Sequence, residues 1–418
     1  MARKILIVCN SFPPKSGIGG RRWVKFAKSL QQEGHQIAVM SRLPNPAEAL
    51  SQWQSDLEAL QIDHHEFYSS VYDRLDALNF SLRKLNSLRF KLSNWVKKLF
   101  VKGDYTELSI GSESSIRSKL SKLAKDFGPD VVIVSGAPFR LCYYLQKHKH
   151  VFSPAPLIVD FRDPWTRFNE EWSFGKLSKK RQEEELAIEN EVFQADAFSF
   201  VPGFLMDYCV DKYNLPKEKV LFLPNCFDPE DYPEGQKDSK KEEISLVYSG
   251  TLYGNLIEPV LSFIRALKAQ SGRSIRVHFF GDLDLSLKRA LELEENLNVE
   301  IHGFVDRELA LNAVKNFDFG LIFLLKNYES AISTKMLDYW AMGKKSIVIG
   351  EEGLVSQLFA NHNLGVFIKL NEIENSRALI ESYRNSDLFC LSIEDFTKQY
   401  SLNMQTAHLN QFIESTLA

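Results

Sequence analysis

Four residues near position 335 have side chains that could bind an anion and a ribose. Ser333 or Thr334 can cap a helix, Lys335 falls in its first turn, and Asp338 follows three residues later on the same helical face. The first backbone N–H groups of a helix lack partners, so a hydroxyl, an ammonium and these amides favour a phosphate. The carboxylate suits ribose hydroxyls, and the set predicts a nucleotide-diphosphate site. The alternative is an ordinary capped helix packed on a sheet.

The residues that follow define the elements that must position this site. Apolar residues recur at helical spacing from Ile332 to Ala341, and Gly343 can end the helix in a left-handed conformation. A buried strand follows within 346–350. The sequence therefore places the lysine and the carboxylate on a short helix next to a parallel sheet.

A glycine-containing loop near the N-terminus is a second candidate site. Gly17, Gly19 and Gly20 separate a strand over 4–9 from a helix that begins at Arg21 and Arg22. Glycines allow the backbone to approach a ligand closely, and the two arginines add positive charge. The loop matches neither a Walker motif nor GxGxxG, and simple turn chemistry is the alternative.

Charged residues at the end of a third strand are candidates for catalysis. The apolar run 156–159 leads to Asp160, Arg162 and Asp163, at the edge where open α/β sheets bind ligands. Two carboxylates bracketing an arginine either form a fixed structural network or meet a polar substrate. We favour contact with a substrate.

The whole chain alternates apolar strands with amphipathic helices, which predicts an α/β fold with two doubly wound parallel sheets. Its 418 residues fit two domains, and a net charge of -3 gives no global reason to expect nucleic acid. The start lacks a secretory signal, no apolar run is long enough to span a bilayer, and five scattered cysteines suggest neither disulfides nor zinc. We therefore expect a cytoplasmic protein.

Residues 78–102 form a basic, apolar-striped segment. Seven lysines or arginines and no acidic residue occur there, with leucines at 78, 85, 92 and 99. If this segment forms a helix, its basic and apolar faces would let it lie on an anionic membrane surface. The alternative is a basic helix packed on its own domain. The membrane interpretation predicts that the protein lies at the inner face of the cytoplasmic membrane.

Short motifs along nearly the whole chain resemble, in order, those of the GT-B glycosyltransferases of family 4, especially bacterial cell-envelope enzymes with an Arg-Asp-x-Trp motif. The matching residues are Ser11–Pro14 with Gly17, Gly19, Gly20 and Arg21; Gly34-His35; 160–165; Glu189 with Ala195-Asp196; Pro224-Asn225 with Asp228; 249–251; 303–305; and 333–335 with Asp338, Tyr339, Ala341 and Gly343. The ordered set, rather than any one motif, carries the resemblance.

The resemblance implies two Rossmann-like domains facing a cleft. We expect an acceptor-side domain over 1–205, a nucleotide-sugar domain over 206–389, and a C-terminal helix within 390–418 that crosses back to the first domain. Members of this family need no metal and no cofactor besides the donor. Gly281-Asp282-Leu283-Asp284 is then a decoy for a metal-binding DxD motif.

The same resemblance assigns roles to individual residues. It implies that the loop 17–20 faces the diphosphate and the transferred sugar, that Gly250 and Thr251 lie under the phosphates, and that Lys335 pairs with them. Asp338 takes the place of a ribose-binding glutamate. The family's other glutamate falls at Ser330, with Glu329 one position off.

Two further departures concern charge. The family's Arg and Lys pair is absent, because residues 252–256 contain no cation. The missing positive charge could come from Arg21, Arg22, Lys335 or Arg307. The departing phosphate, Asp163 or Asp160 could accept the acceptor's proton.

These observations predict a retaining hexosyltransferase of envelope polysaccharide synthesis. It would move a sugar from a nucleotide sugar to a glycan or lipid-linked saccharide. The alternatives are a catalytically silent GT-B partner subunit and a sugar-nucleotide epimerase.

Overall fold

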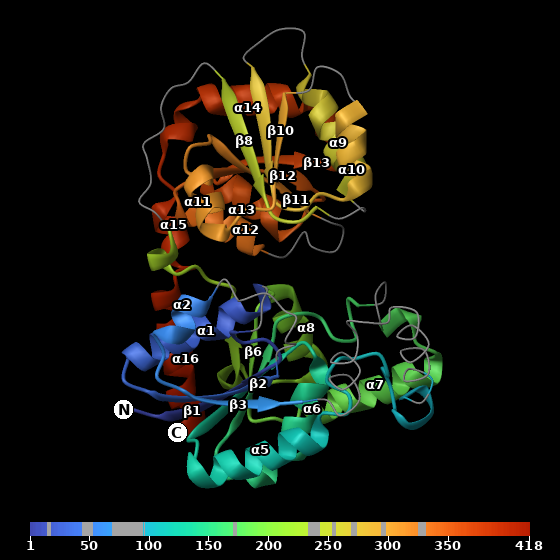
Figure 1. The fold of residues 1–418 in the computed structure, drawn as a ribbon, viewed down its shortest axis with the longest axis vertical. Helices are drawn as coiled ribbons and strands as arrows, with labels where there is room; N and C mark the ends of the chain where they lie inside the picture. The colour runs from blue at the N-terminus through green and yellow to red at the C-terminus, as the bar shows by residue number, and fades with distance from the viewer. Residues whose placement is uncertain are drawn as a thin grey trace, which may run out of the picture. The chain divides into compact units, whose positions relative to one another are not determined.

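The chain forms two compact units in the computed structural model (Figure 1). The structure describes residues 1–14, 18–43, 53–68, 95, 97–169, 174–232, 243–252, 256–268, 274–293, 298–324 and 332–418. The first unit comprises Met1–Pro224 with Gln405–Ala418, and the second comprises Asn225–Met404.

The first unit is built on a parallel sheet. Among the described residues it has seven strands in the order β3-β2-β1-β4-β5-β6-β7. They are β1 (Lys4–Cys9), β2 (Gln36–Arg42), β3 (Asp63–Phe67), β4 (Val131–Gly136), β5 (Leu157–Phe161), β6 (Ala197–Phe200) and β7 (Val220–Phe222). All residues of β4 and β5 are buried, as continuous apolar runs in a doubly covered sheet predict.

Helices connect the strands of the first unit and cover its sheet. They are α1 (Arg21–Gln32), α2 (Gln54–Glu58), α5 (Glu113–Asp126), α6 (Phe139–Lys147), α7 (Lys179–Val192), α8 (Gly203–Tyr213) and α16 (Leu402–Leu417), with 3₁₀ turns η1 (Ile18–Gly20), η2 (Lys149–Val151), η3 (Phe174–Lys176) and η4 (Lys217–Lys219). Trp23, Phe26 and Leu30 of α1 are buried at helical spacing, which fixes that helix to the core.

The second unit repeats the architecture. Its described strands follow the order β10-β9-β8-β11-β12-β13. They are β8 (Ile244–Ser249), β9 (Ile275–Phe280), β10 (Val299–Gly303), β11 (Phe319–Phe323), β12 (Lys345–Gly350) and β13 (Gly365–Lys369). The helices are α9 (Ile257–Leu267), α10 (Leu285–Leu293), α11 (Arg307–Val314), α12 (Thr334–Ala341), α13 (Leu354–His362), α14 (Ser376–Asn385) and α15 (Glu394–Lys398), with η5 (Pro229–Asp231), η7 (Leu370–Asn375) and η8 (Asp387–Cys390).

Two doubly wound parallel sheets were predicted, and the structure confirms them. The division falls between Pro224 and Asn225, whereas the sequence placed it at 205/206. The reason is that β7, which lies beyond position 205, is the last strand of the first sheet, and α8 leads to it. The edge strand β3 carries no usual apolar pattern, because its first four residues are Asp63-His64-His65-Glu66.

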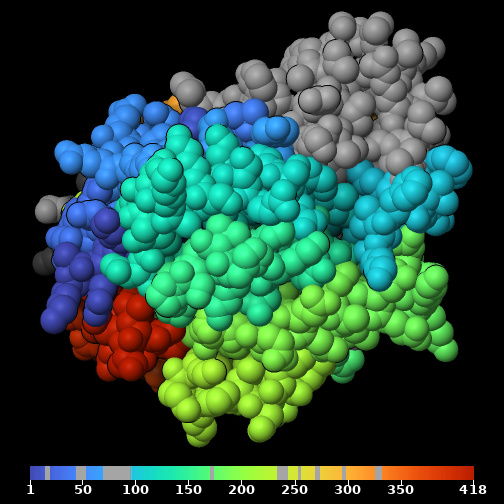
Figure 2. Space-filling view, turned by 90° about the horizontal axis from the view of Figure 1, so that it is seen from below, coloured from blue at the N-terminus to red at the C-terminus, as the bar shows by residue number. Residues whose placement is uncertain are grey.

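The C-terminal helix α16 belongs to the first unit from Gln405 onward. Arg3 donates two hydrogen bonds to Glu414, at 2.8 and 2.6 Å, and Asn410 contacts Glu33. Figure 2 shows the last residues (red) beside the first residues (blue) on one face. The two ends of the chain thus meet on one unit.

Within the described part of the chain, no helix has the length and apolar character needed to cross a bilayer.

Candidate functional site

Lys335 lies directly over Gly250 in the second unit. A Cβ added to Gly250 would come within 2.4 Å of the Lys335 Cε and 3.1 Å of its Nζ, and Gly250 has a φ of +134°. Gly250 follows the last residue of β8, so the ammonium lies at the carboxyl end of the sheet. Burial lowers the pKa of Lys335, while the nearby Asp338 raises it. The contact requires glycine for both its space and its backbone conformation.

Helix α12 holds Lys335 there. The Ser333 hydroxyl accepts a hydrogen bond from the Met336 N–H at 3.3 Å, which confirms this residue as the N-cap. At the other end Gly343 has a φ of +69°, as predicted for a helix terminus. Tyr339 fixes the helix to the sheet, because its hydroxyl donates to Val247 O at 3.1 Å and accepts from Ser249 N at 3.0 Å.

Close packing brings this helix near the sheet. A Cβ on Gly320 would lie 2.1 Å from the Tyr339 ring, so β11 can accept that ring only where it carries glycine. The first turn of α12, with Thr334 and Lys335, is thereby fixed beside the carboxyl end of β8.

Asp338 lies beside an arginine and a tyrosine. Tyr232 donates a hydrogen bond to its Oδ1, and Arg307 Nη2 lies 3.4 Å from the same oxygen. The Arg307 guanidinium also lies 5.4 Å from the centre of the Tyr232 ring. Asp338 retains 22% side-chain exposure. Arg307, named from the sequence as one substitute for the missing basic pair, is therefore close to the proposed ribose residue.

Tyr232 was missed by sequence reasoning. It follows η5, a turn capped by Asp228, whose Oδ1 accepts a hydrogen bond from Glu230 N at 3.1 Å. No local pattern marks this tyrosine, because its partners are 75 and 106 residues further along the chain.

The other predicted residues of the second unit are placed as follows. Thr251 is exposed just after Gly250, and its carbonyl accepts a hydrogen bond from Tyr248 at 3.0 Å. In the predicted decoy, Asp284 Oδ1 accepts from Ser286 N at 2.8 Å at the start of α10, an ordinary role in a helix-leading turn. Glu329 lies outside the described residues, as does Gly17 in the first unit.

Asp160 lies in a buried network in the first unit. It has no solvent exposure and accepts hydrogen bonds from Arg22 at 3.0 and 3.2 Å, from Ser135 at 2.8 Å and from Ser199 at 2.9 Å. Arg22 also donates to the carbonyls of Leu223 and Pro224, at 2.9 and 3.0 Å. Of the two readings left open by the sequence, Asp160 takes the fixed network. Both of its carboxylate oxygens are occupied away from solvent, and its catalytic role stays a prediction.

Arg162 and Asp163 remain closer to solvent. Arg162 is half-buried, and its Nη1 lies 3.5 Å from the Gly19 carbonyl oxygen. Asp163 is exposed. The carboxyl end of β5 thus meets the glycine loop, where Gly20 is buried. Arg21 is also buried, and its guanidinium lies 5.3 Å from the centre of the Trp53 ring.

A second buried charge network lies near the carboxyl ends of β4 and β5. Arg140 and Glu185 form a 2.6 Å ion pair, and Trp165 donates to Glu185 at 2.8 Å. Glu107 accepts from the Arg140 N–H at 2.9 and 3.0 Å, at the start of α6. Burial and the nearby Glu185 charge raise the pKa of Glu107 to about 8. The sequence singled out Trp165 as part of a motif, but not the carboxylates that position it.

Comparisons with known proteins were made on sequence and on structure. Neither a protein-family model nor a curated protein matches the sequence. Solved structures match over almost the full length. The apo lipopolysaccharide outer core galactosyltransferase WaaB has 13% identity and a TM-score of 0.61, with 99% of each chain covered.

Two other solved structures are similar. Anabaena HepE in complex with UDP and glucose has 13% identity and a TM-score of 0.63, over 99% of this chain and 100% of that one. Sucrose-phosphate synthase from Thermosynechococcus elongatus has 11% identity and a TM-score of 0.63, over 98% of each. The chain therefore has the fold of the GT-B glycosyltransferases, with two doubly wound parallel-sheet domains.

Proposed function

We propose that this protein is a glycosyltransferase that moves a sugar from a nucleotide-diphosphate sugar to a glycan or lipid-linked saccharide of the cell envelope. The observation that carries the proposal is the Lys335 ammonium over Gly250 at the carboxyl end of β8. The whole-length similarity to a galactosyltransferase and to HepE bound to UDP supports it. The ordered motifs found in the sequence support the family-4 type.

In the proposed reaction, the bond between the anomeric carbon and the diphosphate oxygen breaks, and the acceptor oxygen bonds to that carbon. Lys335 and the first N–H groups of α12 stabilise the charge that develops on the leaving diphosphate. The acceptor's proton passes to the departing phosphate, with retention of configuration, or to Asp163. We propose Asp163 rather than Asp160 for this role, because both Asp160 oxygens accept hydrogen bonds within a buried network.

The remaining site residues have proposed binding roles. Asp338 accepts hydrogen bonds from the ribose hydroxyls, with Arg307 beside it to add positive charge. Gly19 and Gly20 allow the loop to approach the sugar, and Arg162 contacts the sugar or the acceptor. With cations and amides holding the diphosphate, we propose that transfer needs no metal.

The test is a screen of UDP, GDP and dTDP sugars, starting with UDP-glucose. A donor that raises the melting temperature identifies the base, because a ligand of the folded state stabilises it. Release of the nucleoside diphosphate on adding a membrane extract then measures transfer. A product formed without acceptor would instead identify an epimerase, and binding without turnover would identify a silent partner subunit.

Replacing Asp338 by asparagine is expected to raise the KM for the donor about tenfold, with a smaller change in kcat. A hydrogen bond to a charged group is worth about 1.5–3 kcal/mol, and a tenfold change is about 1.4 kcal/mol. Donor saturation curves measure the effect. The matched control is Asp395→Asn, a fully exposed residue of α15. An unchanged KM would remove Asp338 from the donor site.

We further propose that the segment 78–102 contacts an anionic membrane. Of its residues, the structure describes Trp95 and 97–102; Trp95, Leu99 and Phe100 have exposures of 59%, 59% and 82%. Lys97 is buried at 4% exposure, which lowers its pKa to about 8, so this lysine does not share the solvent-facing charge expected from the sequence. Arg181 anchors the segment by donating to Val101 O at 2.9 Å.

Replacing Leu99 and Phe100 by serine is expected to abolish flotation of the protein with phosphatidylserine-containing liposomes. The reason is that apolar side chains and nearby positive charge act together at an anionic interface. The control replaces exposed Leu293, in the other unit, by serine. If the double variant partitions like the unaltered protein, the membrane contact is elsewhere or absent.

A further inference from the structure

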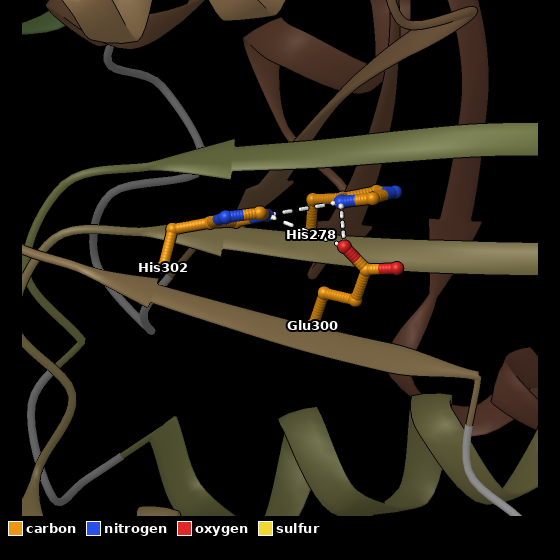
Figure 3. A group of neighbouring side chains, drawn as sticks. All are labelled: His278, Glu300 and His302. Atoms are coloured by element: carbon orange, nitrogen blue, oxygen red, sulfur yellow. Dashed lines mark hydrogen bonds and ion pairs between the residues drawn. The ribbon is translucent and has the colours of Figure 1, made fainter.

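Two histidines and a glutamate converge at the edge of the second sheet. They lie on neighbouring parallel strands, His278 on β9 and Glu300 and His302 on β10 (Figure 3). Glu300 is directly opposite His278 in the register, and His302 follows Glu300 by two positions. Residues two apart in a strand share a face, so the register brings the three side chains together. The ladder is irregular between Ile301 and Gly303, at the position of His302.

The three polar groups have the spacing of metal ligands. His278 Nδ1 lies 3.1 Å from His302 Nε2 and 3.4 Å from Glu300 Oε2. His302 Nε2 lies 3.8 Å from the same carboxylate oxygen. Two ligands each about 2.0–2.1 Å from zinc at a tetrahedral angle are roughly 3.3 Å apart. The observed distances lie on both sides of that value.

Neighbouring side chains contact all three groups. Phe280 stacks on the His302 ring, with 4.1 Å between centroids and 8° between planes, and Phe317 lies 4.5 Å from the His278 ring. Arg276 Nη1 bonds to Glu300 Oε1 at 2.5 Å, which leaves Oε2 directed toward the histidines. Such outer contacts orient ligands in metal sites.

The cluster is also open to solvent. The side chains of Glu300 and His302 are 43% and 32% exposed, while that of His278 is 12% exposed. The two imidazole planes differ by 13°.

We propose that His278, Glu300 and His302 bind one divalent transition-metal ion, with Zn²⁺ as the reference ion. Two imidazoles and one carboxylate form a three-ligand set that leaves a position for water. The three residues are not among those assigned to the donor site around Lys335, and the inference does not depend on the proposed transfer reaction. A metal site here is compatible with metal-independent transfer, because that proposal concerns only how the diphosphate is held.

The experiment titrates Zn²⁺ into the full chain after chelator treatment, under a phosphine reductant that keeps the cysteines reduced, and measures binding by calorimetry. Co²⁺ absorption then reports the ligand geometry. His302→Gln is the main variant, because this side chain is exposed and its loss spares the core. His278→Gln is the second variant. The matched control is His362→Gln, an exposed histidine of the same unit.

The unaltered protein and the His362→Gln control are expected to bind one ion at a site that each cluster variant weakens at least about tenfold. Zn²⁺ should raise the melting temperature of the unaltered protein but not that of His302→Gln. The proposal is overturned if Zn²⁺ binds His302→Gln as tightly as the unaltered protein. It is equally overturned if the unaltered protein binds no Zn²⁺, since the two histidines would then form only the hydrogen bond between their rings.

Discussion

Replacing Lys335 by methionine is expected to lower kcat/KM for sugar transfer by about a hundredfold to a thousandfold. Removing one preorganised electrostatic group from an active site typically costs about 2.7–4 kcal/mol of transition-state stabilisation. Lys335 can supply such stabilisation, because its ammonium is largely removed from solvent above Gly250. Methionine keeps an unbranched stem over the glycine and removes the charge, so the change isolates the electrostatic contribution.

Initial rates of nucleoside diphosphate release, measured with the donor identified by the screen, test this prediction. The control is Lys288→Met on α10, an exposed lysine of the same unit, which should leave the rate unchanged. Circular dichroism should show the same fold for both variants. A Lys335→Met protein that retains more than about a tenth of the activity would mean that the diphosphate is held elsewhere, since even one oxyanion-directed group is worth more.

Replacing Asp160 by asparagine is expected to destabilise the first unit by about 3–5 kcal/mol. Breaking a buried ion pair leaves an uncompensated charge in the interior. Here that charge is the guanidinium of Arg22, whose side chain is 5% exposed, and the lost carboxylate is fully buried. In the unaltered protein, Arg22, Ser135 and Ser199 donate hydrogen bonds to the carboxylate. The N–H groups of an asparagine amide cannot accept these bonds, so at least one of the three donors would lose its partner.

Urea unfolding, followed by the transition of the first unit, measures the effect. The control is Asp163→Asn, three residues along and exposed, which should change stability by no more than about 0.5 kcal/mol. The double variant Arg22→Met, Asp160→Leu should recover most of the loss, because a buried pair replaced by apolar groups is often neutral. A loss below about 1 kcal/mol in the single variant would show that solvent reaches Arg22.

Local signals were sufficient for the elements of the proposed donor site. The Ser333 cap, the helix that follows and the left-handed Gly343 depend on interactions within a few residues, and the structure confirms all three. The strand expected over 4–9 and the apolar run 156–159 likewise correspond to the parallel strands β1 and β5. These features could be predicted because helix caps and strand burial are properties of short segments.

Strand ends were a weaker guide to the role of each charged side chain. Asp160 lies near the end of β5 and Asp163 lies two residues beyond it, yet the first is fully buried and the second is exposed. The difference comes from Arg22, Ser135 and Ser199, which lie 138, 25 and 39 residues away in the chain. No local pattern reports partners at such separations.

Periodicity, helix capping and apolar runs act over short distances, so they were enough to predict two doubly wound sheets and the capped helix that carries Lys335. The position of Lys335 over Gly250 and the pairing of Asp160 with Arg22 became visible only in the folded chain. The folded chain also decided that His278 and His302 face each other, through the register of two strands. The physical reason is that charge pairing and metal-ligand spacing depend on distances in space, which the packing of remote segments sets.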